Sequence, residues 1–430
     1  MLITQESASY QDAVPPGGQP PWLARHRAAG MARFAAEGYP KRSQEAWRFT
    51  DLRPLTASVF PPAPPDPVAV DAATVAPHRL PCPSHRLVLV NGRFAPALSD
   101  IGVLPEGVWL GSVTDALRER PDLVAASLAE GEASLAALNA ALFADGFVLA
   151  VEAGVTLEAP VEVIHYADMG APAAAHVRNR MVVGAGGRAT VIETSTGVGA
   201  GWLNTVTVVT VATGGALRHV QLQRDAAEAI HTSVVRGDLA GDARYESFSL
   251  MAGGRLSRRD IQVNLGGPGA SVALNGAYLL RGSQEATFAP VVTHAAPHCR
   301  TDEVVKGVMQ DRAHGVFLGT VRVHPGADGT DARQLNRNLL LSPTAWVDTK
   351  PELEILADDV KCSHGATVGS LDEASLFYLQ ARGIDPATAR LMLVEAFAAD
   401  VIDGAGLDEP IRDHVHGHLR SWLDGLEGGR

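Results

Sequence analysis

The sequence predicts a mainly β protein with helical flanks, and three observations support this fold class. From about residue 147, short stretches of alternating apolar and polar residues recur about every ten residues for roughly two hundred residues. Gly, Pro and Asp separate these stretches, as turns require. Helical periodicity is confined to the two flanks. We therefore predict a mixed N-terminal region (1–146), a central β body (147–369) and a small C-terminal helical domain (370–430).

The pattern of the β body is clearest between residues 261 and 274. Apolar residues alternate with polar ones at Ile261, Val263 and Leu265, and again at Val272 and Leu274 after a GGPG turn. A β-sandwich of this length would be unusual, whereas frequent turns favour a solenoid in which each coil packs on the next. The pattern alone leaves both architectures open. A solenoid would need its open ends covered, and the helical flanks could supply that cover.

Two helices are predicted before the β body. One carries Leu23, His26, Met31 and Phe34 on a single face, as expected for a helix packed on a core. The other lies in SLAALNAALFADG and is expected to end at Gly146, which would occupy the position after the last helical residue.

Three short helices are predicted after the β body. The first should begin at Leu371, because Ser370 and Glu373 match a capping box, and should end at Gly383. Asp385, which precedes a proline, should cap the second helix. The apolar stripes of the second and third helices are Leu391, Val394, Phe397 and Val401, and Ile411, Val415, Leu419, Trp422 and Leu426.

Composition limits the classes of function. The chain has 36 basic and 48 acidic residues among 430, a net charge of −12, which argues against nucleic-acid binding. No apolar run approaches the ~20 residues that cross a bilayer, and the N-terminus does not resemble a secretory signal. Cys82, Cys299 and Cys362 are too few and too far apart for a disulfide framework. We therefore expect a cytoplasmic protein with protein or small-molecule partners.

Cys362 and His364 are the first candidate site. We expect them in a loop that leaves the β body, where an extended backbone would point both side chains to the same face. Two ligands do not make a metal site, because zinc sites normally use three or four protein ligands. Another residue or subunit would have to complete the set. A buried thiol beside a histidine bonded to the backbone is an equally good interpretation.

His294, His298 and Cys299 form a second candidate metal site. The two histidines have the i, i+4 spacing that would bring them together on a helix. The intervening proline and the preceding β pattern argue against a helix there, so metal binding is the less favoured interpretation.

Asp358 and Asp359 are paired carboxylates, as a polysaccharide-cleaving β-solenoid enzyme would need. A solvated turn explains them better, and only 5% of the residues are aromatic, few for a sugar-binding cleft. The glycine clusters lie between predicted strands, and no G-x-x-x-x-G-K-[ST] motif occurs, so the chain shows no sign of an ATPase site.

The segment SQEAWRFTDL contains Glu45, Trp47, Arg48 and Thr50, which could form a stacking and ion-pair cluster. Packing of the N-terminal region onto the β body explains these residues equally well.

Several long, collinear segments resemble the SufB/SufD family of iron–sulfur cluster assembly proteins, and they fit the SufD side of it. The segments are LEILADDVKCSHGATVGSLDEASLFYLQARGI, EAWRFTDL, LNAALFADG, HAAPHCRTDEVVKGVMQDRAHGVFLGTVRV and TDARQLNRNLLLSPTAWVDTKPELEI. The resemblance implies a right-handed parallel β-helix between an N-terminal helical region and a C-terminal helical domain. It thus favours the solenoid over the sandwich.

The resemblance also implies partners. A SufB-like homologous subunit would pair with the chain through the β-helix, and two SufC-like ABC-type ATPases would complete the complex. One of them would dock on the helices from about Ser370 onward. Leu391, Phe397 and Trp422 would then be mostly core, with exposed charges as the docking rim. A homodimer is possible for the isolated chain.

For the site, the resemblance implies that His364 helps to form a transient iron–sulfur cluster beside a thiolate of the SufB-like subunit. Cys362 is the weaker candidate, as a sulfur relay or a buried thiol. This chain has His364-Gly365 where SufB-like chains have His-Glu, so we expect no cluster held stably by this chain alone. The expected function is a non-catalytic scaffold. The alternatives are a carbohydrate-active solenoid enzyme and a purely structural interaction protein.

Overall fold

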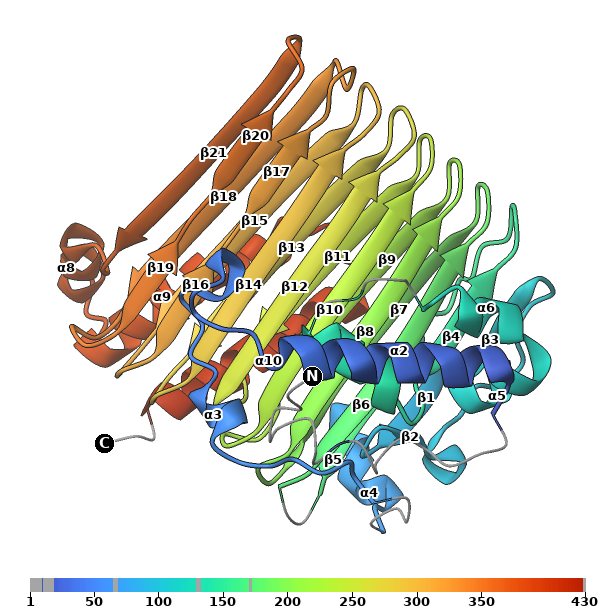
Figure 1. Ribbon diagram of the computed structural model, residues 1–430. Coiled ribbons are helices and arrows are strands. Elements are labelled where there is room, and N and C mark those ends of the chain that lie inside the picture. Colours follow the sequence, from blue (N-terminus) through green and yellow to red (C-terminus); the bar gives the residue numbers. More distant parts are fainter. Residues whose placement is uncertain are drawn as a thin grey trace.

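Two parallel sheets form the body of the protein. The computed structural model describes residues 10, 19–64, 69–128, 132, 134–169 and 172–427. From β4 (Phe147–Val151) to β15 (Arg300–Met309), successive strands alternate between a ten-stranded and an eleven-stranded sheet. Strands of successive coils pair in parallel, so the chain winds as a parallel β-helix (Figure 1). The solenoid is confirmed and the sandwich excluded.

The strands extend from residue 85 to residue 369. The ten-stranded sheet contains β2 (Arg93–Phe94), β1 (His85–Val90), β5 (Val161–Asp168), β7 (Arg188–Val198), β9 (Ala216–Gln223), β11 (Arg244–Met251), β13 (Ser271–Leu280), β15, β18 (Thr330–Leu340) and β21 (Val360–Gly369). The eleven-stranded sheet contains β3 (Val108–Ser112), β4, β6 (Ala174–Val183), β8 (Trp202–Val211), β10 (Ile230–Leu239), β12 (Leu256–Leu265), β14 (Glu285–His294), β16 (His314–Phe317), β17 (Thr320–Val323), β19 (Trp346–Thr349) and β20 (Glu352–Ile355).

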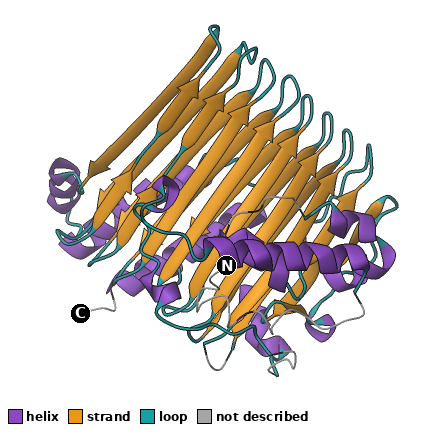
Figure 2. Cartoon of the chain, in the orientation of Figure 1, coloured by secondary structure: helices purple, strands orange, loops and turns teal. Residues whose placement is uncertain are grey.

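Helices lie before, beside and after the sheets (Figure 2). The α-helices are α2 (Pro21–Glu37), α3 (Arg53–Thr56), α4 (Ala72–Val75), α5 (Val113–Glu119), α6 (Pro121–Ala125), α7 (Ser134–Leu142), α8 (Glu373–Ala381), α9 (Pro386–Asp403) and α10 (Glu409–Glu427). Short 3₁₀ turns occur at Glu45–Trp47, Ala76–His78 and Pro96–Leu98. None of the described helices has the length and apolar character needed to span a bilayer.

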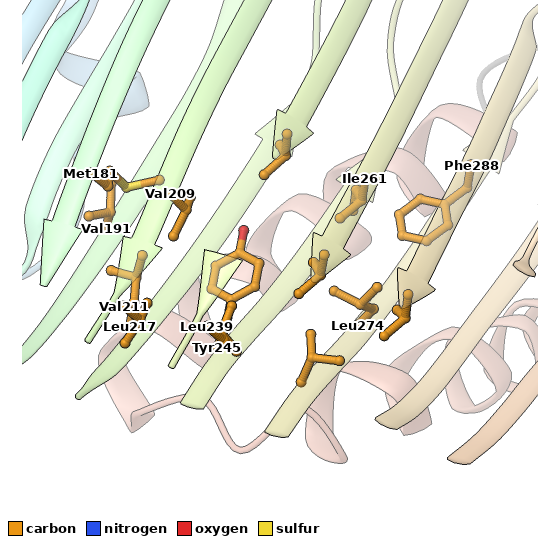
Figure 3. Packing of buried hydrophobic residues seen from close by; sticks show 14 of the residues in the cluster. Met181, Val191, Val209, Val211, Leu217, Leu239, Tyr245, Ile261, Leu274 and Phe288 are labelled. Atoms are coloured by element: carbon orange, nitrogen blue, oxygen red, sulfur yellow. The ribbon is translucent and has the colours of Figure 1, made fainter. Parts of the chain in front are cut away.

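Inward-facing side chains fill the space between the two sheets. Ile261, Val263 and Leu265 of β12 are buried there, as their alternation predicted, and Leu274 of β13 and Phe288 of β14 lie close by (Figure 3). A side chain of this size stabilises the fold by roughly 1.5–3 kcal/mol when it is fully buried. The alternation therefore identifies the inner face of each coil.

The N-terminal helices cover the outer face of the eleven-stranded sheet. Met31 and Phe34 of α2 pack in one cluster with Trp202 of β8, and α2 lies across the strands in Figure 1. Arg27 of α2 is buried and donates hydrogen bonds to the carbonyl oxygens of Ala141 (2.8 Å) and Phe143 (2.9 Å). These contacts join α2 to the end of α7 and confirm the predicted N-terminal helix.

The C-terminal helices cover the outer face of the ten-stranded sheet. Val394 of α9 and Leu419 of α10 share a buried cluster with Val220 and Phe248 of that sheet. Lys306 of β15 donates a hydrogen bond to the carbonyl oxygen of Phe397 on α9 (2.8 Å). The helical domain is therefore packed directly on the β-helix.

Gly146 does not end a helix, contrary to our prediction. Helix α7 ends earlier, at Leu142. A Cβ atom at Gly146 would lie 1.9 Å from the carbonyl oxygen of Arg178, so glycine is required there for a close approach between two backbones.

The capping box predicted at Ser370 and Glu373 is also wrong. Helix α8 begins at Glu373, and its N-cap is Asp372, whose carboxylate accepts a hydrogen bond from the backbone N–H of Ser375 at 2.9 Å. Strand β21 continues to residue 369, so Ser370 falls in the connection between strand and helix. Asp and Ser are comparable N-caps, and this local sequence offers both.

The other helix signals are confirmed. Gly383 follows α8 with a φ of 88°, a conformation that favours glycine. Asp385 caps α9 by accepting hydrogen bonds from the backbone N–H groups of Ala387 (3.0 Å) and Thr388 (3.1 Å). The buried members of the two predicted stripes are Val394, Val401, Ile411, Val415, Leu419 and Trp422.

Candidate functional site

Cys362 and His364 lie on a strand, not in the loop that we expected. Both belong to β21, which pairs in parallel with β18 along its ten residues. The pairing shows that this segment forms the last coil of the β-helix. Its polar, glycine-containing sequence lacks the apolar alternation of a buried strand, which explains the wrong prediction.

Strand β21 is the edge of the ten-stranded sheet. Among the described strands it pairs with β18 only, and Figure 1 shows it at one end of the stack. One side of its backbone can therefore pair with a strand of another chain. Most side chains of β21 are exposed, because no further coil covers them.

Cys362 and His364 point to the same face, as predicted, but differ in environment. They stand in register with Ala332 and Gln334, which occupy buried positions of β18. The Cys362 side chain packs against a small apolar cluster that includes Val321, and burial raises the pKa of its thiol. The thiol is therefore protonated and poorly reactive at neutral pH. His364 is exposed to solvent.

The two side chains do not complete a metal site. No cluster of three or more His, Cys, Asp or Glu side chains suited to a metal ion occurs within the described residues. An iron ion would need more ligands than Cys362 and His364 supply. Another chain placed against β21 could supply them, because His364 is exposed at that edge.

His294, His298 and Cys299 do not form the second candidate metal site. His294 ends β14 and is buried, with its Nε2 atom 2.7 Å from the hydroxyl of Thr301. Burial lowers the pKa of His294 to about 4. His298 lies in a turn with a φ of 60°, and Cys299 is buried. These residues serve the packing of a corner of the coil.

Asp358 and Asp359 lie in the turn between β20 and β21 and are exposed. The carbonyl oxygen of Asp359 accepts a hydrogen bond from the backbone N–H of Gly329 at 2.7 Å. A surface pocket on the ten-stranded sheet is lined by charged groups, including Arg244 and Arg300, but by no aromatic side chain. The geometry therefore favours a solvated turn over a glycosidase pair.

The segment that contains Glu45 and Trp47 packs on the body. The guanidinium of Arg258 lies 3.7 Å from the centre of the Trp47 ring and donates a hydrogen bond to the Thr50 hydroxyl at 2.9 Å. Lys350 and Glu45 form an ion pair at 2.5 Å. These contacts hold the N-terminal segment against the eleven-stranded sheet.

Sequence reasoning missed two buried polar residues beside the site. Glu303 of β15 and Gln334 of β18 are in register with each other and with His364. The alternation of the strand could have revealed Glu303, because Glu303 lies two residues before the buried Val305 and therefore faces the same side of the strand. A carboxyl group at an inner position of a predicted strand calls for an explanation.

A further missed feature is the exposed apolar surface at this end of the molecule. Helix α8 has no buried residue. The large apolar side chains exposed on β19, β20, β21 and α8 and in the residue after β20 are Trp346, Ile355, Leu356, Val368, Phe377 and Tyr378.

Comparison with known proteins gives a consistent result. A family model described as "SUF system FeS cluster assembly, SufBD core domain" matches residues 165–397, and a "SufBD protein N-terminal region" model matches residues 12–163. The iron–sulfur cluster assembly protein SufD of Escherichia coli is 31% identical, with 92% of each chain covered. An iron–sulfur cluster assembly SufBD family protein of Synechocystis is 29% identical, over 92% of this chain and 90% of its own. The chloroplastic protein ABCI7 of Arabidopsis thaliana is 28% identical over 98% and 91%.

Proposed function

The chain belongs to the SufBD family of iron–sulfur cluster assembly proteins, and on that premise we propose that it is a SufD-like scaffold subunit. It pairs with a SufB-like homologous subunit through β21 and places His364 at the junction. It catalyses no reaction of its own. Cluster assembly is driven by SufC-like ABC-type ATPases that bind the complex, which we place in the cytoplasm.

The observation that carries this proposal is the position of His364 on a free sheet edge. An edge strand offers backbone N–H and C=O groups to a partner strand. The exposed Val368 of β21 and Leu356, just after β20, add apolar surface at the same end. A partner strand added to β21 would cover the imidazole of His364 and bring its own side chains beside it. In the isolated chain, the same edge can support a homodimer.

His364 then contributes one ligand to iron or to the nascent cluster, which is cargo and not a resident cofactor. Imidazole and thiolate can ligate one iron–sulfur site together. The thiolate comes from the SufB-like subunit, because burial raises the pKa of the Cys362 thiol and disfavours its own thiolate. Cys362 remains a secondary candidate for holding sulfur. The cluster is transient, since this chain supplies too few ligands to hold it alone.

We expect His364→Ala to lower the cluster content of the complex without preventing its assembly. The test is anaerobic co-expression with the SufB-like and SufC-like subunits, followed by counts of iron and acid-labile sulfide. His364 is exposed, so its removal leaves the β-helix core intact. The matched control is His324→Ala, because His324 is exposed in the turn after β17. If the His364→Ala complex carries as much cluster as wild type, the role of the chain is purely structural.

Helix α8 and the neighbouring surface of α9 form the proposed dock for the ATPase. Helix α8 follows the last strand and begins with a well-formed N-cap. Its residue Phe377 is nevertheless 73% exposed. Tyr378 and Met392 are also exposed. An exposed aromatic side chain on an ordered helix is typical of a protein interface.

Phe377→Ala should weaken binding of the SufC-like ATPase by about tenfold or more, the effect of losing an aromatic anchor at an interface. The measurement is titration of the purified chain with the ATPase. Met392→Ala should have a smaller effect, since Met392 is less exposed. Equal binding of wild type and Phe377→Ala would place the dock elsewhere.

A further inference from the structure

A row of inward-facing side chains leads from the interior of the coil to His364. Leu274, Glu303, Gln334 and His364 occupy the same register position on β13, β15, β18 and β21. Adjacent strands lie about 4.8 Å apart, so each side chain in the row is within reach of the next one. Glu303 and Gln334 are thus the two residues directly beneath the candidate ligand.

Glu303 and Gln334 are buried, joined to each other and incompletely bonded. The Nε2 atom of Gln334 donates a hydrogen bond to Oε2 of Glu303 at 2.8 Å. The Oε1 atoms of both side chains are buried without a partner among the described residues. Buried polar atoms are nearly always satisfied, in many cases by ordered water. Both oxygens therefore require a further hydrogen-bond partner such as an ordered water molecule.

The chain between β16 and β17 lies directly against the amide of Gln334. Gly319, between β16 and β17, approaches Gln334 so closely that a Cβ atom there would lie 2.2 Å from Nε2. A larger residue at position 319 would displace the amide. Gln334 itself is buried, whereas His364, the next position of the row, is exposed.

The amide can take two orientations, and the charge of Glu303 selects between them. An ionised carboxylate only accepts hydrogen bonds, so Gln334 must donate its NH₂ group to it. A protonated carboxyl group can donate instead to the amide oxygen, and the amide then turns by half a rotation. In the first case Gln334 presents its oxygen toward His364, and in the second it presents its NH₂ group.

We propose that Glu303 and Gln334 are positioning residues for His364, and that the protonation of Glu303 sets the tautomer of the imidazole through the amide of Gln334. The contact between Gln334 and His364 passes through one water molecule, since Oε1 of Gln334 has no partner among the described residues. The chemistry is a reversible proton transfer: the carboxylate binds one proton from solvent, becomes neutral, and releases it again. This inference rests on the proposed role of His364 as a ligand.

The orientation of the amide decides whether His364 can bind iron. When the amide oxygen faces His364, the bridging water donates to that oxygen and accepts the N–H of one ring nitrogen. The other ring nitrogen then presents its lone pair outward for a metal. When the NH₂ group faces His364, the bridging water accepts from it and donates to the inner ring nitrogen, so the proton of the imidazole lies on the outer nitrogen. Ionised Glu303 therefore favours the ligating tautomer, and protonated Glu303 disfavours it.

The environment of Glu303 brings this change close to physiological pH. Burial raises the pKa of Glu303 from its ordinary value of 4.5 to about 8, against the lowering effect of the bond from Gln334. Asp302, on the outer face of the same strand, adds to the rise through its negative charge. Leu274, the neighbour in the row on the other side, contributes no charge. The ligating tautomer is therefore favoured as the pH rises through about 8.

The test is NMR of the isolated full chain with labelled histidine, in which ring carbon and nitrogen shifts report the two tautomers. His364→Ala identifies the resonance. In wild type we expect the tautomer ratio of His364 to change about fivefold with a midpoint near pH 8, the ratio for one hydrogen bond of ~1 kcal/mol. Both Glu303→Gln and Gln334→Leu should abolish this change of the tautomer ratio with pH.

Glu354→Gln is the matched control, because Glu354 is an exposed carboxylate on β20 near the same end. This variant should retain the change of the His364 tautomer ratio near pH 8. A constant ratio in wild type between pH 7 and 9, or an unchanged pH dependence of that ratio in Glu303→Gln, would overturn the inference. This readout requires neither cluster nor partner, so it can fail while His364→Ala still lowers the cluster content, and the two ideas are tested separately.

Discussion

Replacing Arg178 with methionine is expected to lower the free energy of unfolding by about 3 kcal/mol, the cost of breaking a buried ion pair. Arg178 projects from the outer face of β6 and is only 1% exposed. It is paired with Glu132 at 2.5 Å and bonded to the backbone carbonyl of Ser127 and the side chain of Asn139. These bonds hold α7 and the chain before it against the eleven-stranded sheet. Methionine would preserve much of the volume but would leave part of the charge of Glu132 uncompensated.

The measurement is urea unfolding of the isolated chain, in which Arg178→Met should show a lower midpoint at an unchanged slope. Arg236→Met is the control, because Arg236 also contacts Glu132, at 2.6 Å, but its side chain is 23% exposed. That variant should lose less than about 1 kcal/mol, as partly exposed ion pairs do. An equal loss of unfolding free energy in both variants would show that burial does not determine how much an ion pair with Glu132 stabilises the fold.

Replacing Val368 with aspartate is expected to lower the affinity for the SufB-like subunit by about 30-fold or more, the effect of ~2 kcal/mol at an interface centre. Val368 is 50% exposed on β21. In the proposed pair it is covered by the partner strand, so a carboxylate at this position would be desolvated without a counter-ion. The fold of the single chain should change little, because the side chain is not part of the core.

The affinity is measured by titrating the purified SufB-like subunit with each variant. Val103→Asp is the matched control, because Val103 is 93% exposed and lies far away in sequence, between β2 and β3. It should bind as wild type does. If Val368→Asp binds the SufB-like subunit with the affinity of wild type, the pairing surface is not the β21 edge. The proposed position of the cluster site would then be wrong.

Much of the fold could be predicted because it is recorded in local patterns. The alternation at Ile261 and Val263 identified the inner face of a strand, since only one face of each coil is buried. The cap at Asp385 located the start of α9, because an N-cap bonds within its own turn. Gly146 misled the prediction, because its role is a contact with Arg178, a residue 32 positions away in the sequence.

The candidate site was predicted in part. His364 and Cys362 were identified from their residue types, and the same-face prediction is confirmed by their register with Gln334 and Ala332. Their place on an edge strand could not be predicted, because β21 lacks the apolar alternation of a buried strand. Its strand conformation comes from pairing with β18. Long-range pairing thus overrode the weak local preference.

The amino-acid sequence alone is sufficient to predict the coil repeat, the helical flanks and the identity of the candidate ligands. Periodicity and capping depend on only a few neighbouring residues. The stacking of the coils settles which polar residues share a row. It places Glu303 and Gln334 beneath His364 and leaves β21 at the edge of the ten-stranded sheet formed by the described strands. These features depend on the register between strands about 30 residues apart, which no local pattern records.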